Sequence, residues 1–115
     1  MNVKITGIGH YLPEKIIDNK YLQDKFKLDE ASIFKRTGIR ERRYVADGVT
    51  TTDLVCNAVS NLLENTKKKV TDIDCLICGT LTPDYFFPST AVSSINKMEA
   101  HKAWGFDISA ACSGF

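Results

Sequence analysis

A cysteine near the end of the sequence has the surroundings of an acyl-transfer nucleophile. Cys112 lies in the stretch DISAACSGF, where Ala110, Ala111, Ser113 and Gly114 are all small. Small neighbours let the backbone bend sharply between a strand and a helix, and a helix N-terminus favours the thiolate form of a cysteine. Enzymes present acyl-accepting nucleophiles in this way. The same residues also suit a cysteine packed in a core, so both interpretations stay open at this level.

A cluster of basic residues in the first half of the chain has the chemistry of a phosphate site. Five cationic side chains fall within nine positions: Lys35, Arg36, Arg40, Arg42 and Arg43. Guanidinium groups chelate phosphate oxygens in a fixed fork, although such a cluster is also typical of a solvated surface. Nucleic acid is a poorer candidate, because the formal net charge is only +1 and no aromatic residues alternate with the basic ones.

Two further patterns have both a functional and a structural interpretation. Cys75 and Cys78 have the spacing of a metal or redox pair, but IDCLICG is typical of a buried strand, in which positions three apart face opposite sides. We therefore expect two structural cysteines and no metal. TPDYFFPS places three aromatic residues just before a helix start, where they either fill the core or line an apolar pocket.

The predicted elements alternate between strand and helix. Leu54, Ala58 and Leu62 form an apolar row at helical spacing, which predicts a helix over residues 51–66 capped by Thr51 or Thr52. The other predictions are a strand at 3–9, a loop at 10–19, a short helix capped by Asn19, a helix from about Asp29 that Gly38 ends, a strand-like stretch at 40–45, a strand at 73–79, a helix at 88–98 and a strand at 104–109. This order predicts a layered α/β fold with helices against a mixed or parallel sheet.

The composition excludes several classes of protein. Hydrophobic residues make up 43% and charged residues 25% of the chain, which is typical of soluble globular proteins. No apolar run is long enough to span a membrane, and the start MNVKITGIGH lacks the apolar core of a signal peptide. We therefore expect a cytoplasmic protein whose four cysteines are free thiols.

Four stretches together resemble one enzyme family. ITGIGHYLPEKIIDN, RTGIRERR, TPDYFFPSTA and FDISAACSGF, in this order and spacing, are similar to the N-terminal part of β-ketoacyl-acyl-carrier-protein synthase III, a thiolase-fold condensing enzyme. The resemblance covers essentially the whole chain. It implies a thiolase-like layered α/β fold, with residues 1–115 forming the N-terminal portion of an incomplete domain.

The resemblance also implies an activity. The family condenses a short acyl-CoA with malonyl-acyl-carrier protein to start fatty acid synthesis. Cys112 matches the nucleophile that takes the acyl group as a thioester. Arg36 and Thr37 match positions that contact the nucleotide end of CoA, and Phe87 matches an acyl-pocket position reached across a homodimer interface. No metal or prosthetic group is implied.

The sequence departs from the family in two respects. Ser32 stands near where many bacterial members carry a tryptophan that stacks on adenine, so a donor bound to a carrier protein stays an alternative to acyl-CoA. The histidine and asparagine of the family's condensing chemistry belong to a C-terminal half, and the helix expected after Cys112 is missing too. We therefore expect the chain alone to be an inactive fragment that associates through uncovered apolar faces. Another thiolase-fold acyltransferase, such as a secondary-metabolite ketosynthase or a hydroxymethylglutaryl-CoA synthase relative, and a non-catalytic dimerisation or binding module are the alternatives.

Overall fold

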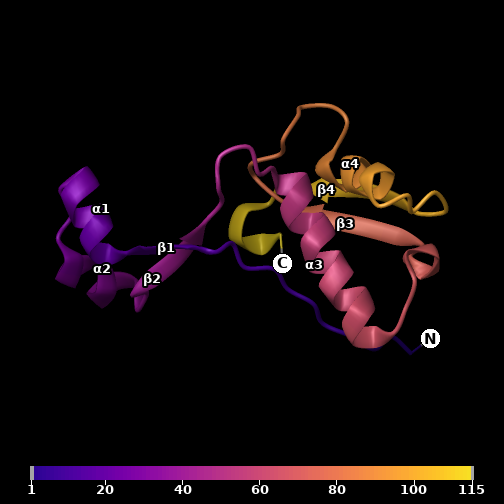
Figure 1. Cartoon of the computed structure of the whole chain (residues 1–115), viewed down its shortest axis with the longest axis horizontal. Helices are drawn as coiled ribbons and strands as arrows, with labels where there is room; N and C mark the ends of the chain where they lie inside the picture. The colour runs from indigo at the N-terminus through magenta and orange to yellow at the C-terminus, as the bar shows by residue number, and fades with distance from the viewer. Residues whose placement is uncertain (1, 115) are drawn as a thin grey trace. The chain divides into compact units, whose positions relative to one another are not determined.

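A computed structural model describes residues 2–114 of the chain. The chain forms two compact units (Figure 1). The first, here called the sheet unit, comprises Met1–Tyr11 with Val49–Phe115, and the second, here called the hairpin unit, comprises Leu12–Gly48. That residues 1–115 form part of a single larger domain stays a prediction.

The sheet unit contains a pair of parallel strands joined through a helix. Its elements are α3 (Thr51–Thr66), the 3-10 turn Val70–Asp72, β3 (Cys75–Gly79), α4 (Thr90–Lys97), β4 (Trp104–Ile108) and the 3-10 turn Ala111–Ser113. β3 and β4 pair in parallel, with Cys75 opposite Trp104 and Gly79 opposite Ile108. A parallel pair needs a crossover connection, which α4 supplies. The predicted strand–helix–strand alternation of this region is confirmed.

The core of the sheet unit lies around α4. This helix contacts both strands and also α3. Ala91 is fully buried, Ile95 nearly so, and Val59 of α3 and Cys78 of β3 are buried with them. Gly105 of β4 makes this packing possible, because a Cβ there would lie 2.9 Å from the Ile95 Cδ1 atom and 3.2 Å from the Ala91 Cβ atom. Burial of small residues thus brings α4 close to the sheet.

The hairpin unit is a pair of short helices between two antiparallel strands. Its elements are β1 (Lys15–Asp18), α1 (Asn19–Phe26), α2 (Glu30–Thr37) and β2 (Glu41–Tyr44), with Lys15 opposite Tyr44 and Asp18 opposite Glu41. Asp29 caps α2 by accepting a hydrogen bond from the Ser32 amide at 2.7 Å, and Gly38 ends it at a φ of 70°. Both ends of α2 therefore lie where the sequence predicts them.

Some predicted elements differ from the structure. The strand expected at residues 3–9 is wrong: these residues form no strand, because no other strand among residues 2–114 pairs with them. β1 lies instead in the expected loop, where Ile17 is buried and β2 supplies the partner. The helix caps are earlier than predicted, by one residue at Asp18 for α1 and by one or two residues at Thr50 for α3. The helix predicted over 88–98 spans Thr90–Lys97, capped by Ser89.

Candidate active site

Cys112 lies on a tight turn immediately after a parallel strand. β4 ends at Ile108, and the 3-10 turn Ala111–Ser113 holds the cysteine with its side chain exposed. The Ser113 amide donates to the Ala110 carbonyl at 2.9 Å. Ala111 has a φ of 47°, in the left-handed region that residues other than glycine seldom adopt. Strained backbone of this kind concentrates at functional sites, and here it forms the turn that carries the exposed thiol.

The neighbouring strand fixes the position of this turn. The Thr80 amide donates to the Ile108 carbonyl at 3.1 Å, which extends the pairing of β3 and β4 to the edge of the turn. A Cβ at Gly79 would lie 2.8 Å from the carbonyl oxygen of Gly114, so the absence of a side chain there lets the backbone after Cys112 approach β3 closely. The thiol is therefore presented from a hydrogen-bonded strand end.

Phe87 belongs to an exposed aromatic loop, defined here as residues 80–89, in the same unit as Cys112. Tyr85, Phe86 and Phe87 have exposed fractions of 64%, 106% and 87%. Of the two interpretations left open by the sequence, a place in the core does not agree with this exposure, and an apolar surface or pocket edge remains. A hollow of about 390 Å³ adjoins the loop and is lined by Thr80, Leu81, Pro83, Tyr85, Phe86, Ser89, Asp107 and Ser109. It places the loop and the end of β4 around one cavity.

Arg36 and Thr37 lie together at the end of α2, in the hairpin unit. They line a hollow of about 400 Å³ with Lys27, Leu28, Asp29, Ser32 and Ile33. Arg36 is exposed, whereas the Thr37 hydroxyl donates to the Ile33 carbonyl at 2.7 Å and accepts from the Ile39 amide at 3.1 Å. The hydrogen bond from Ser32 lowers the pKa of Asp29, so this hollow offers two cations and one anion. Sequence reasoning missed Lys27, whose only signal was its place near a helix end.

The predicted basic cluster serves several purposes in the structure. Arg42 donates to the Ile17 carbonyl at 3.2 Å and to Asn19 Oδ1 at 2.7 Å. Arg43 donates to the carbonyls of two residues before β1, at 3.2 and 3.3 Å. These two arginines hold the hairpin unit together, and only Lys35, Arg36 and Arg40 remain exposed without that task.

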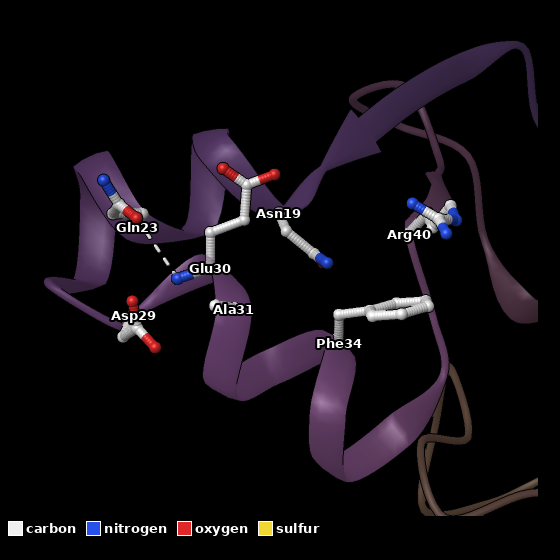
Figure 2. Close-up of a pocket in the computed structure, with 7 residues that line it drawn as sticks. All are labelled: Asn19, Gln23, Asp29, Glu30, Ala31, Phe34 and Arg40. Atoms are coloured by element: carbon white, nitrogen blue, oxygen red, sulfur yellow. Dashed lines mark hydrogen bonds between the residues drawn. The ribbon is translucent and has the colours of Figure 1, made fainter.

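Arg40 lies beside a second hollow of the hairpin unit. Its guanidinium carbon is 4.3 Å from the centre of the Phe34 ring, a cation–π arrangement visible in Figure 2. The hollow measures about 490 Å³, and Figure 2 also shows Gln23 accepting a hydrogen bond from the Glu30 amide, at 3.1 Å. Asn19 is buried there and donates to the Ile39 carbonyl at 2.8 Å. Its amide thereby fixes the turn that follows Arg36 and Thr37.

Two aspartates that sequence reasoning did not single out connect the candidate site to helix ends. Asp84 of the aromatic loop accepts from the amides of Thr51 and Thr52, at 2.6 and 2.8 Å. Asp107 of β4 accepts from the amides of Thr90 and Ala91, at 2.7 and 2.8 Å. Both carboxylates meet the positive end of a helix. Their only signal in the sequence is that each is an acidic residue within a quoted motif, TPDYFFPS for Asp84 and FDISAACSGF for Asp107.

The other three cysteines differ from Cys112 in their surroundings. Cys78 is buried and Cys56 and Cys75 are half-buried, whereas Cys112 is exposed. Burial raises the pKa of the Cys56 and Cys78 thiols, which keeps them protonated. The strand predicted for the Cys75–Cys78 stretch is confirmed as β3, and it places these two thiols on opposite faces. Cys112 is therefore the thiol most open to a reagent in solution.

Comparison with known proteins finds relatives of one kind along nearly the whole chain. No protein-family model matches the chain. The β-ketoacyl-[acyl-carrier-protein] synthase III of Koribacter versatilis (strain Ellin345) is 41% identical over 112 residues, covering 97% of this chain and 34% of the relative. The crystal structure of 3-oxoacyl-[acyl-carrier-protein] synthase III from Aquifex aeolicus VF5 has a TM-score of 0.88 at 38% identity, covering 97% of this chain and 36% of the other. The chain matches part of β-ketoacyl-acyl-carrier-protein synthase III.

A third relative comes from another biosynthetic setting. The priming β-ketosynthase of the R1128 polyketide biosynthetic pathway has a TM-score of 0.90 at 32% identity, covering 97% of this chain and 34% of the other. The predicted thiolase-like α/β fold is confirmed by these two structures, each of which the chain matches over about one third of its length. It spans about one third of the length of the curated relatives it matches. Within residues 2–114, no helix combines the length and apolarity that crossing a membrane requires.

Proposed function

We propose that the chain carries the acyl-accepting site of a β-ketoacyl-acyl-carrier-protein synthase III. The observation that carries the proposal is the exposed Cys112, on a strained turn at the end of a parallel strand, in a chain 41% identical to such a synthase. In the proposed reaction a short acyl-CoA acylates the cysteine, and malonyl-acyl-carrier protein then takes the acyl group.

The first half-reaction is a thioester exchange at Cys112. The Sγ thiolate attacks the carbonyl carbon of the acyl-CoA, a carbon–sulfur bond to Cys112 forms, and the bond to CoA breaks, so that CoA leaves as the thiolate and takes up a proton. In the second half-reaction decarboxylation of the malonyl group supplies the carbon nucleophile, a carbon–carbon bond forms, and Cys112 leaves again as the thiolate. Neither of the two proposed half-reactions requires a metal or a prosthetic group.

The donor would be held by the hollow at the end of α2. Arg36 and Lys27 place two cations there, which suits the phosphates of CoA. Thr37 keeps the end of α2 in place through its two hydrogen bonds. Ser32 offers no aromatic surface in the same hollow, so donor binding would depend on charge and would weaken with salt. A carrier-protein-bound donor stays the alternative.

The remaining parts of the proposal concern the acyl group and the assembly. Phe87 is proposed to line the acyl pocket, and its exposed fraction of 87% suits a residue covered by the partner subunit of a homodimer. Four free cysteines suit a cytoplasmic protein. Because the curated relatives are about three times as long as the chain, we also propose that residues 1–115 alone do not complete the condensation.

Acylation followed by peptide mapping tests the proposal. After incubation of the protein with acetyl-CoA, mass spectrometry should locate one acetyl group on Cys112. Cys112→Ser should abolish the label, and the matched control Cys56→Ser should retain it. An unlabelled Cys112 would support a non-catalytic binding module instead. β-Ketoacyl product made by the 115-residue chain from acyl-CoA and malonyl-acyl-carrier protein would refute the proposed inactivity of that chain.

A second candidate is the priming ketosynthase of a secondary-metabolite pathway. The observation that favours it is the TM-score of 0.90 to the R1128 priming enzyme. Both candidates acylate Cys112, so the distinguishing measurement is the preferred donor. A panel of acyl-CoA chain lengths, each offered to the protein at the same concentration, separates a synthase that favours short fatty acid primers from one that favours a different primer.

A further inference from the structure

We propose that Asp84 is the positioning residue of the aromatic loop and thereby sets acyl-chain selectivity. The selectivity part rests on the proposed function, because it takes Phe87 as the lining of an acyl pocket. The positioning part rests on contacts within the sheet unit alone. Phe87 follows Asp84 by three residues in the chain, so a displacement at residue 84 is carried to the ring by a short stretch of backbone.

The first ground is the way Asp84 completes the end of α3. The helix already has its own cap, since Thr50 accepts from the Asp53 amide and the Asp53 carboxylate accepts from the Thr50 amide. A local cap of this kind leaves the amides of Thr51 and Thr52 free at the first turn. Asp84 takes both, one with each carboxylate oxygen, at 2.6 and 2.8 Å. The aspartate therefore connects the loop to a helix that has its own local cap.

A third hydrogen bond reinforces this connection. The Thr51 hydroxyl donates to the Thr82 carbonyl at 2.8 Å. Burial would raise the pKa of Asp84, but its hydrogen bonds with Thr52 and Thr51 outweigh burial and lower the value from 3.8. The carboxylate is thus ionised at neutral pH, and charge-assisted hydrogen bonds at a helix N-terminus are stronger than neutral ones.

The second ground is that, within residues 2–114 of a single chain, little else holds this part of the loop. Tyr85, Phe86 and Phe87 are all exposed, so burial of their rings contributes little to the loop's position. Beyond them the chain is fixed again at Ser89, which caps α4 by accepting from the Val92 amide. The segment between Asp84 and Ser89 is therefore anchored at its two ends, and Asp84 is the anchor next to the aromatic residues.

The expected effect of removing this anchor is a change in selectivity with acylation retained. Asp84→Ala frees the loop, so that the Phe87 ring samples more positions while Cys112 stays on its own turn. We expect the ratio of Cys112 acylation rates with acetyl-CoA and hexanoyl-CoA to change by about tenfold or more, because small misplacements of positioning groups have effects of this size. Asp84→Asn retains an acceptor for one amide and should give an intermediate ratio.

The matched control is Asp72→Ala. Asp72 also accepts a backbone hydrogen bond in the sheet unit, from the Lys69 amide at 2.9 Å, but it lies in a different turn. If the effect of Asp84→Ala came from a general loss of stability, Asp72→Ala should show it too. We expect instead that Asp72→Ala keeps the wild-type ratio of acylation rates with acetyl-CoA and hexanoyl-CoA. A ratio that changes equally in both variants would refute a specific role for Asp84.

Limited proteolysis tests the positioning part independently of any acyl transfer. Chymotrypsin cleaves after exposed aromatic residues, and we expect faster cleavage at Tyr85 and Phe86 in Asp84→Ala than in the wild type or in Asp72→Ala. Unchanged cleavage would overturn the positioning role. Faster cleavage with an unchanged acylation ratio would overturn the selectivity role alone. A wild-type protein that is not acylated would refute the proposed function and with it the selectivity role, and cleavage would still decide the positioning role.

Discussion

Removing the Asp107 carboxylate should strongly destabilise the sheet unit. Asp107 lies on β4 and accepts hydrogen bonds from the first two amides of α4, those of Thr90 and Ala91. Thr90 and Ala91 have exposed fractions of 2% and 0%, so water has little access to these amides once the carboxylate is gone. A buried donor that loses its partner bears its full desolvation cost.

The magnitude follows from these two hydrogen bonds. Each bond to a charged group contributes about 1.5–3 kcal/mol, while the Ser89 cap of α4 remains. We therefore expect Asp107→Ala to lower the free energy of unfolding by about 3–6 kcal/mol, and Asp107→Asn, which retains one acceptor oxygen, by roughly half as much. The exposed Asp47, which lies outside any helix or strand, serves as the control, and Asp47→Ala should change the stability by less than about 0.5 kcal/mol.

The chain offers its own reporter for this measurement. Trp104 is the only tryptophan in the sequence and lies on β4, stacked on Phe106 at 5.8 Å between ring centres. Urea unfolding followed by its fluorescence therefore monitors the strand that carries Asp107. With a slope of about 1–3 kcal/mol per molar urea, a loss of about 3–6 kcal/mol should lower the midpoint by about 1 M or more. A fall in stability of less than about 1 kcal/mol at an unchanged slope would show that the two amides find other partners, and the reasoning would be refuted.

Two further predictions concern α3. A Cβ at Gly9 would lie 2.6 Å from the Cα and Cβ atoms of Leu62, so Gly9→Ala should destabilise the sheet unit by about 1–3 kcal/mol, and an unchanged urea midpoint would contradict this close approach. The hydrogen bond from Lys97, followed by those from the Thr50 amide and hydroxyl, lowers the pKa of Asp53 from 3.8 to about 2. Because the folded-state pKa is depressed, this contribution to stability is present above the unfolded value and is lost as the pH falls from about 4 to about 2. Asp53→Asn should remove this part of the pH dependence, measured as urea midpoints on both sides of the window, and an Asp53→Asn curve parallel to that of the wild type would disprove the assignment.

Local patterns in the sequence predict several elements correctly. The apolar rows of residues 51–66 predict the bounds of α3, and Asp29 and Gly38 predict both ends of α2, because capping depends on residues within one turn. The predicted cap of α3, Thr51 or Thr52, is one or two residues late, since Thr50, Thr51 and Thr52 have the same capping chemistry and only the structure selects among them. The tight turn at Cys112 also followed from its small neighbours.

Features that depend on distant partners could not be predicted. β1 lies among residues without a strong strand pattern and exists because β2 pairs with it, whereas the alternating residues 3–9 lack a partner strand among the described residues. The basic cluster gave no sign that Arg42 and Arg43 bind backbone carbonyls far away in sequence. The roles of Asp84 and Asp107 arise from hydrogen bonds across 16 to 33 positions, which no local pattern encodes.

The contacts of Asn19 have a consequence for how donor binding responds to acid and base. The turn after Thr37 is held by the Asn19 amide, by the Thr37 hydroxyl and, through Asn19, by the Arg42 guanidinium. Amides and hydroxyls do not ionise in the range where proteins are studied, and arginine stays charged there. The turn should therefore keep its shape through the second ionisation of a phosphate monoester, near pH 6. The affinity of this turn for a phosphate-bearing donor should therefore depend on pH through the ionisation of the donor. A change in affinity near pH 6 would report the charge on the donor phosphate.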